Sequence, residues 1–266
     1  MVSLKTTKEI KIMAKGGEIL AMVLDRLIEE AKVGVSLKSL DKLAEKLIVE
    51  SGAEPSFKKV KDYHWTICAC PNDVVVHGVP SDYILKKGDV LGIDCGVYLD
   101  GFHTDSAWTL QIGNSEKHDN KSEVKKFLDK GKEALLLAIK EVKPDNYIYD
   151  ISKIIQQTIE KAGYSVVKVL VGHGVGKNLH EDPEIPGFIN KKRKETLKIC
   201  PGMVFAIEVI YNMGSGEVVY KKGNKWTIVT KDGKISGLFE VTVAVTPHGS
   251  LVLTQIQSLK NKLTKN

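Results

Sequence analysis

Each arm of a short apolar hairpin carries an aspartate in the stretch GIDCGVYLDGFHTD, which runs from residue 92 to residue 105. The pair Asp100-Gly101 is the strongest short signal for a two-residue type I′ turn. Counting outward from that turn puts Asp94 and Asp105 on one face as diagonal neighbours, roughly 7–8 Å apart at the backbone. Two bare carboxylates there would repel, and one would bind a proton unless a cation lies between them.

Two glutamates occupy equally unusual places, each in the middle of an apolar run. Alternation in MVFAIEVI and in GLFEVTVAVT puts Glu208 and Glu240 on faces that they share with apolar residues. Glutamate is disfavoured in strands, and an unpaired buried carboxylate is costly. An edge position or a local hydrogen bond could explain one such acid, but four acids in four strands favour a shared role.

Three histidines lie at the end of apolar segments or soon after them. His173 stands between two glycines in VGHGVG, His180 follows seven residues later, and His77 ends the run in VVVHGVP. A lone histidine is more often a structural group than a ligand, but four misplaced acids favour the ligand interpretation. Four carboxylates balance two divalent cations, and oxygen-rich sites with one histidine suit Mn²⁺, Fe²⁺, Co²⁺ or Zn²⁺. Two such ions about 3.5–4 Å apart would form a hydrolytic centre.

Helices must flank these strand segments, and the sequence marks where they begin. The pattern Thr6-x-x-Glu9 is a capping box, and apolar residues at helical spacing follow it. Ser36 begins a second helix, and two more helices are expected over 122–141 and 148–162. Strands are expected over 66–78, 89–97, 102–112, 165–173, 203–211, 217–221, 226–230 and 238–246.

The chain also contains a faint internal repeat. A shift of 111 residues aligns the apolar positions of the second helix with those of the helix over 148–162. Each half is then two helices followed by strands, and such blocks favour an α+β fold. We therefore expect one domain over residues 1–250, with a pseudo-twofold axis at which ligands from both halves could meet, and a Lys-rich C-terminal tail over 251–266.

The composition excludes several classes of protein. Of 266 residues, 42% are hydrophobic and 27% charged, and the formal net charge of +6 comes almost entirely from lysine. Without arginine clusters, sequence-specific nucleic-acid recognition is not expected, and the Lys-Lys-Arg-Lys run over 191–194 is expected to be a solvated face. No apolar run approaches the ~20 residues of a membrane span, so we expect a cytoplasmic protein. The cysteines at 68, 70, 95 and 200 form no CxxC motif, which fits a reducing compartment.

Taken in order, these residues resemble the dinuclear metallopeptidases of the pita-bread fold, and type I methionine aminopeptidases most closely. The resemblance spans roughly residues 5–250 and rests on the blocks VVVHGVP, GDVLGIDCGVYLDGFHTDSAWT, VGHGVGKNLHEDPEIP, PGMVFAIE and SGLFEVTVAVT. It implies an α+β, creatinase/aminopeptidase-like fold in which two pseudo-symmetric halves of helices pack on a curved antiparallel sheet. The implied activity is the removal of the N-terminal methionine from nascent proteins whose second residue is small.

The resemblance also implies roles for individual residues. The implied metal ligands are Asp94, Asp105, His173, Glu208 and Glu240. Asp105 and Glu240 would bridge the two metals. Asp94 would bind one metal, and His173 and Glu208 would bind the other. A bridging hydroxide would attack the scissile carbonyl while Glu208 moves the proton. His77 and His180 would hold the substrate, and the latter would also stabilise the developing oxyanion.

The substrate pocket of this family is apolar and aromatic. Its positions fall here on Tyr63, Cys68, Leu179 and Trp226, with Leu179 standing where an aromatic residue is common. A monovalent cation of the family would lie near Asn72, Val74 and Ser236, bound mostly by backbone oxygens.

Two residues beside the ligands depart from the family pattern. Val209 follows Glu208 where the family usually has proline, and Val241 follows Glu240 where it usually has histidine. Neither change removes a ligand, so both bear on the level of activity more than on metal binding. Only 31 residues separate the two glutamates, which leaves no room for the helical insertion of type II enzymes. Without a Cys-rich N-terminal extension, a bacterial-like enzyme is expected, and an organellar one is the alternative.

Two other functions fit the same resemblance. A related pita-bread peptidase that acts before proline would be expected to carry a large additional N-terminal domain. A non-catalytic binding protein on the same fold would be expected to lose ligands, whereas all five are present. For the enzyme we expect nascent peptide N-termini as substrates, a monomer, no membrane partner, and docking near the ribosome surface assisted by the positive charge.

Overall fold

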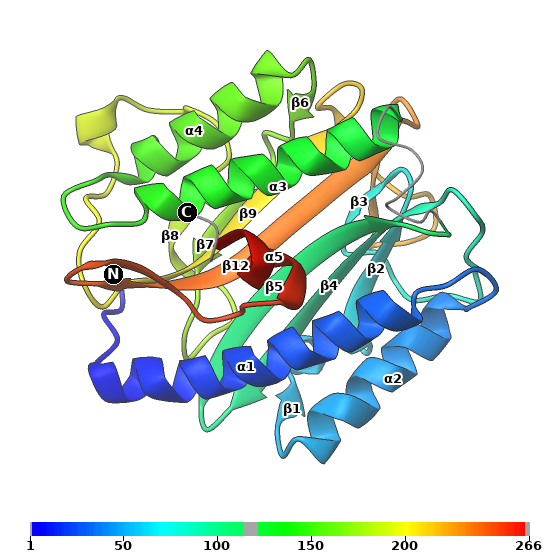
Figure 1. Ribbon diagram of the computed structural model, residues 1–266, viewed down its shortest axis with the longest axis horizontal. Coiled ribbons are helices and arrows are strands. Elements are labelled where there is room, and N and C mark those ends of the chain that lie inside the picture. The colour runs from blue at the N-terminus through cyan, green and yellow to red at the C-terminus, as the bar shows by residue number, and fades with distance from the viewer. Residues whose placement is uncertain (1, 114–121, 264–266) are drawn as a thin grey trace.

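A curved antiparallel sheet forms the middle of the molecule and carries the long helices on one face (Figure 1). The computed structural model describes residues 2–113 and 122–263. Along its main path the large sheet has the strand order β1-β4-β5-β12-β9-β7-β8, and β2, β6 and β13 pair with β4, β9 and β12. These strands are β1 (Glu54–Pro55), β2 (Ile67–Pro71), β4 (Val90–Leu99), β5 (Phe102–Gln111), β6 (Ser165–Val166), β7 (Val171–Gly174), β8 (Glu181–Pro186), β9 (Val204–Asn212), β12 (Ser236–Thr246) and β13 (Gly249–Val252).

A second, smaller sheet has the order β10-β11-β3. Its strands are β10 (Val218–Tyr220), β11 (Ile228–Thr230) and β3 (Val74–Val76). The expected single strand over 66–78 is therefore two strands in different sheets, because the chain turns at Asn72, whose φ of 56° lies in the left-handed region. Strand β8 was not expected, since its polar sequence EDPEIP lacks apolar alternation.

The helices begin where their capping residues predict. Helix α1 (Thr7–Glu30) starts after Thr6, whose hydroxyl accepts from Glu9 N while the Glu9 carboxylate accepts from Thr6 N. Helix α2 (Leu37–Glu50) starts after Ser36, whose hydroxyl accepts from Ser39 N. Figure 1 shows α1 and α2 across one half of the sheet.

The second half repeats this arrangement. Helices α3 (Glu123–Glu141) and α4 (Ile148–Lys161) lie across the other half of the sheet (Figure 1). Both ends of α4 fall 111 residues after the ends of α2, so the expected repeat shift is confirmed. Helix α3 approaches the sheet closely at Gly131, where a Cβ atom would collide with the rings of Tyr211 and Phe239.

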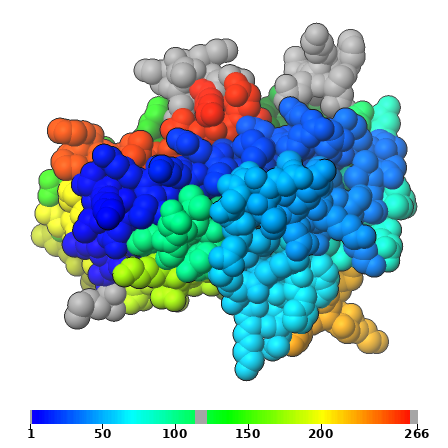
Figure 2. Space-filling view, turned by 90° about the horizontal axis from the view of Figure 1, so that it is seen from below, coloured from blue at the N-terminus to red at the C-terminus, as the bar shows by residue number. Residues whose placement is uncertain are grey.

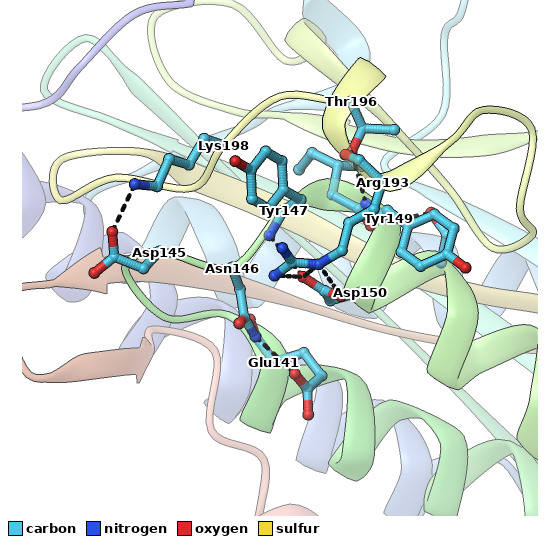
Figure 3. A network of polar contacts seen from close by, with 11 residues as sticks. Glu141, Asp145, Asn146, Tyr147, Tyr149, Asp150, Arg193, Thr196 and Lys198 are labelled. Atoms are coloured by element: carbon cyan, nitrogen blue, oxygen red, sulfur yellow. Dashed lines mark hydrogen bonds and ion pairs between the residues drawn. The ribbon is translucent and has the colours of Figure 1, made fainter.

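The connection between α3 and α4 is held by a network of polar contacts with the segment around residue 195 (Figure 3). The Arg193 guanidinium donates to both carboxylate oxygens of Asp150, at 2.8 and 2.9 Å, and stacks over the Tyr147 ring. Lys198 Nζ lies 2.7 Å from Asp145 Oδ1. Residues 191–194, which include the start of the 3₁₀ helix η2 (Arg193–Glu195), are exposed as expected.

The C-terminal segment differs from the expected Lys-rich tail over 251–266. The expected boundary at residue 250 falls inside β13, which pairs with β12. Ile256 and Leu259 are then almost fully buried, the latter in helix α5 (Gln257–Leu263), while residues 264–266 lie outside the described part. The difference has a simple cause: the buried apolar residues Val252, Leu253, Ile256 and Leu259 all come before the first lysine of the segment, Lys260.

One core lies between the helices and the sheet. Leu20, Leu24 and Leu27 of α1 are fully buried there, as are Val209 and Val241 of the central strands. Each large aliphatic side chain contributes roughly 1.5–3 kcal/mol on burial. Because successive strand residues point to opposite faces, Glu208 and Glu240 must then point away from this core. Figure 2 views the molecule from below, where α1 and α2 make up much of the surface in blue.

Candidate metal centre

One register row crosses the sheet on the face opposite the helices. Cys68 on β2 lies opposite Asp94 on β4, which lies opposite Ala107 on β5. Ala107 in turn lies opposite Glu240 on β12, which lies opposite Glu208 on β9. Residues of one row point to the same face, so three carboxylates line up across the middle of the sheet.

Two further side chains join this row. Ala107 has no side chain beyond Cβ, so the centre of the row is open. Asp105, two residues earlier on β5, points to the same face into that opening. His173 enters from β7, opposite Ala206, which is two residues before Glu208. The hairpin pairing predicted from the Asp100-Gly101 turn is confirmed in every pair, and both turn residues have positive φ.

The ligand-type atoms come within reach of one another. One such atom each of Asp105, His173 and Glu240 lie within 4.8 Å of one another. His173 Nε2 is 3.6 Å from Glu208 Oε1 and 3.9 Å from Asp105 Oδ2. His173 Nδ1 lies 2.8 Å from the Gly174 carbonyl oxygen, which can only accept, so Nδ1 carries the hydrogen. In the neutral ring Nε2 then offers its lone pair to the carboxylate cluster.

Burial makes this cluster electrostatically unfavourable by itself. Burial and the charge of Glu208 raise the pKa of Asp94 to about 8. Burial, together with the neighbouring carboxylates, raises the pKa of Asp105, Glu208 and Glu240 well above their usual range. Burial also lowers the pKa of His173 to about 4, which keeps its ring neutral at pH 7. Two like charges about 4 Å apart repel by roughly 4 kcal/mol at an effective dielectric constant of 20.

The residues present fit a pair of divalent cations. Among the described residues, Asp94 Oδ1, Asp105 Oδ1 and Glu240 Oε1 are buried without a hydrogen-bond partner. Such orphaned acceptors are rare in proteins, and a cation would satisfy them and remove the repulsion. Four carboxylates and one neutral imidazole, without a thiolate, are typical ligands of catalytic first-row divalent metals rather than of structural zinc.

A pocket of about 120 Å³ opens onto this cluster. All eleven predicted site residues line it, and their individual roles stay a prediction. Tyr63 and Trp226 meet edge to face at 5.2 Å between ring centroids, and the Tyr63 hydroxyl donates to Ile67 O at 2.9 Å. Cys68 and Leu179 complete the apolar side. The pocket is thus acidic at one end and apolar at the other.

His77 and His180 line the same pocket as the acids. The His173 and His180 rings meet edge to face at 4.4 Å. Burial, and next the neighbouring His180, lower the pKa of His77 to about 4. His77 has a φ of 54°, a conformation that turns the chain sharply at the end of β3. Both rings can therefore donate or accept a hydrogen bond as neutral imidazoles.

Three pocket residues were missed by the sequence interpretation. These are Phe57, Val60 and Val76. Phe57 lies in the 3₁₀ helix η1 (Phe57–Lys59), where no helical or strand periodicity could indicate which way it faces. Val76 directly precedes His77, and this adjacency was the one available signal for it. Two of the three expected cation-loop residues also meet, since Ser236 N donates to Asn72 O at 2.9 Å.

Comparison with known proteins gives one consistent result. The sequence model of metallopeptidase family M24 matches residues 11–247. A methionine aminopeptidase of Clostridium perfringens is 42% identical over 257 residues, which is 97% of this chain and 100% of that protein. Methionine aminopeptidase 1 of Bacillus subtilis is 42% identical over 256 residues, which is 96% of this chain and 100% of that protein.

Solved structures agree with the sequence comparison. The crystal structure of methionine aminopeptidase from Thermotoga maritima superimposes with a TM-score of 0.90 at 33% identity, over 96% of this chain and 100% of that one. Agreement over nearly the whole length confirms the expected pita-bread fold, with its two halves of helices on a curved antiparallel sheet.

Proposed function

We propose, from the premise that the chain belongs to metallopeptidase family M24, that the five buried ligand-type side chains hold two divalent metal ions. The chain is a metal-dependent hydrolase, a methionyl aminopeptidase, that removes the N-terminal methionine from proteins. The identity of the metals is part of the proposal: Mn²⁺, Fe²⁺, Co²⁺ and Zn²⁺ all suit the oxygen-rich ligand set.

The ligands divide into three groups in this proposal. Asp105 and Glu240, the most deeply buried acids, would be shared by the two ions. Asp94 would hold the ion on the β4 side, and His173 and Glu208 would hold the ion on the β7–β9 side, which follows their placement in the sheet. When bound, the two ions would supply a nucleophilic water at neutral pH and polarise the scissile carbonyl.

The protein's own side chains would carry the proton transfers. Glu208 is the least buried of the acids, with its side chain 12% exposed, so its carboxylate is accessible to take a proton from the attacking water. It would then deliver that proton to the leaving amine. His180, beside the cluster at the pocket rim, would donate a hydrogen bond to the carbonyl oxygen as negative charge develops there. His77 would hold the substrate backbone from the opposite element.

The shape and charge of the pocket support cleavage after the first residue only. Its apolar end, between Tyr63, Cys68 and Trp226, would take the methionine side chain, whose thioether packs well against aromatic edges. Its acidic end would attract the free α-amino group, which an internal peptide bond lacks. A pocket of about 120 Å³ leaves little space for chain on the amino side of that residue.

The single observation that carries the proposal is the convergence of four carboxylates on one pocket, three of them with a buried oxygen that has no hydrogen-bond partner among the described residues. The test is a peptide panel with metal-depleted protein reloaded with Mn²⁺ or Co²⁺. We expect release of methionine from Met-Ala and Met-Gly peptides, little from Met-Leu peptides, and none without metal. Equal release of the first residue from Leu-Gly peptides, or activity that survives metal depletion, would contradict the proposal.

Further parts of the proposal concern the cellular setting. Among the described residues, none of the helices combines the length and the apolar character that crossing a membrane requires. We infer a type I, bacterial-like enzyme that acts in the cytoplasm as a monomer on nascent N-termini. The net charge of +6 supports docking at the ribosome surface. Ribosome co-sedimentation that does not weaken across a salt series would argue against an electrostatic contact.

A further inference from the structure

The two halves of the sheet meet at β5 and β12 through an unusual junction. Within each half the strands pair along their lengths, as β4–β5 and β9–β12 do. At the junction the regular pairing is reduced to Glu240 opposite Ala107. This junction lies directly under the proposed metal ligands, because it joins the strand of Asp105 to the strand of Glu240.

At this junction side-chain hydroxyl groups make hydrogen bonds to the backbone of the facing strand. Asp105 N donates to Thr242 Oγ1 at 2.9 Å, and the same hydroxyl donates to Asp105 O at 2.7 Å. Ser106 Oγ donates to the Glu240 carbonyl oxygen at 2.7 Å. Thr109 Oγ1 accepts from Leu238 N at 2.9 Å and donates to Leu238 O at 2.7 Å. We call Ser106, Thr109 and Thr242 the hydroxyl seam; all three are at most 1% exposed.

Strand alternation explains why Asp105 needs a partner on this side. In a two-residue hairpin the residues flanking the turn, here Leu99 and Phe102, form a hydrogen-bonded pair. Alternation then makes Asp105 part of a non-hydrogen-bonded pair, so its N–H and C=O point away from β4 and towards β12. Thr242 satisfies both groups with a single hydroxyl.

Thr242 is itself held in place by the C-terminal segment. Its N–H donates to Thr254 Oγ1 at 2.9 Å, and its carbonyl accepts from Leu253 N at 2.8 Å. Thr254 is fully buried. A chain of short hydrogen bonds therefore runs from residue 254 through Thr242 to the backbone that carries Asp105.

We propose that Thr242 is a positioning residue for the metal centre, which sets the backbone of Asp105 relative to Glu240. Ser106 acts reciprocally, by fixing the backbone of Glu240 from the strand of Asp105. The inference rests on the proposed function, since it takes these two carboxylates as ligands that both metals share. Groups that orient metal ligands typically change metal affinity about 10- to 100-fold when they are removed.

The seam contains its own matched control. Thr109 makes the same two hydrogen bonds to Leu238 that Thr242 makes to Asp105, at the same distances and with the same burial. Replacing either threonine by valine keeps the shape and leaves one N–H and one C=O without a partner. Both variants should therefore lose comparable stability, whereas only the change at Thr242 touches the backbone of a ligand.

The experiment compares Thr242→Val, Thr242→Ser and Thr109→Val with the full wild-type chain. Mn²⁺ binding to metal-depleted protein is followed by titration calorimetry, and stability by urea unfolding. We expect both valine variants to unfold at similarly reduced urea concentrations. Only Thr242→Val should bind Mn²⁺ about 10- to 100-fold more weakly, and Thr242→Ser, which keeps the hydroxyl, should bind like wild type.

Each other outcome has a definite meaning. Equal Mn²⁺ affinity in Thr242→Val and Thr109→Val would overturn the positioning role and leave the ligand assignment intact. A wild-type chain that does not bind Mn²⁺ would overturn the ligand assignment and this inference with it. If Thr242→Val does not fold, Ser106→Ala replaces it, because that change removes one hydrogen bond to the Glu240 backbone. Unchanged Mn²⁺ affinity in Ser106→Ala would then count against the inference.

Discussion

Lys5 Nζ lies 2.6 Å from Glu181 Oε2, and the two side chains are only 3% and 9% exposed. This ion pair joins the start of the chain to the loop that carries His180. Glu181 uses its other oxygen to accept from Asn178 N at 3.0 Å. Gly176 lies so close to the Lys5 side chain that a Cβ there would collide with it. In Figure 2 the dark-blue N-terminal segment lies beside the yellow-green segment of this loop.

Removing the lysine should destabilise the protein and disturb the loop. Lys5→Met leaves Glu181 as a buried charge without its partner, which costs about 3–5 kcal/mol. We expect the free energy of unfolding to fall by that amount. We also expect kcat/KM to fall, since His180 directly precedes Glu181 in the chain. Urea unfolding and steady-state kinetics on Met-Ala peptides measure the two effects. Lys177→Met, an exposed lysine of the same loop, is the control and should change neither.

Losing one bridging carboxylate should abolish most activity. Asp105→Asn keeps the shape of the side chain but removes one of four negative charges, so we expect fewer bound Mn²⁺ ions. We also expect kcat to fall on the order of 10²–10³-fold, as for the loss of one group that stabilises developing charge. Asp100→Asn changes the exposed turn of the same hairpin and should behave like wild type. An Asp105→Asn protein with full activity would exclude this residue as a ligand.

Metal binding should release protons. The pKa of each acid in the cluster is raised in the metal-free fold, that of Asp94 to about 8, so part of the cluster is protonated at pH 7. Mn²⁺ must displace these protons, and its affinity should rise with pH between about 6 and 8. The raised values also mean that the metal-free protein loses stability as pH rises through this window.

Calorimetry measures the release of protons on Mn²⁺ binding directly. The apparent heat of Mn²⁺ binding should depend on the ionisation enthalpy of the buffer at pH 7, and the dependence should shrink above pH 8. The same heat in two buffers of different ionisation enthalpy would show that the carboxylates are already charged without metal.

The polar network in Figure 3 should affect stability with the opposite pH dependence, because the pKa of Asp150 is lowered rather than raised. Burial opposes the shift, but hydrogen bonds from Arg193 and from Tyr147 N outweigh it and lower the pKa of Asp150. A lowered carboxylate pKa adds stability above the unfolded value of 3.8, and this stability is lost as pH falls through the folded value. Asp150→Asn should therefore lower the free energy of unfolding by about 1 kcal/mol at pH 7 and by less near pH 3. Urea unfolding at both pH values measures the two losses. An equal loss of stability at the two pH values would contradict the lowered pKa of Asp150.

Local chemistry predicted much of this fold. The Asp100-Gly101 turn determined the pairing of β4 with β5, because a two-residue loop allows one register. Thr6 and Ser36 predicted helix starts because their hydroxyls satisfy N–H groups only a few residues away. The acids stood out because carboxylates in apolar strands need a compensating partner.

Contacts between distant segments could not be predicted in the same way. Lys5 and Glu181 are 176 residues apart, and neither has a local pattern that indicates the other. Thr242 looks like any strand threonine until its neighbours on β5 and on the C-terminal segment are known. The burial of Leu259 also depends on where that segment packs, because a short helix with lysines has the same sequence pattern in solvent.

The division of the five ligands between the two halves also sets a time for the enzyme's own activation. Asp94 and Asp105 lie in the first half, but Glu240 comes 135 residues after Asp105 (240 − 105). With Glu240 as a shared ligand, a growing polypeptide has no complete centre until residue 240 leaves the ribosome. The enzyme that trims new proteins would therefore be inert until that point of its own synthesis, and copies that stop before residue 240 would be unable to cleave anything.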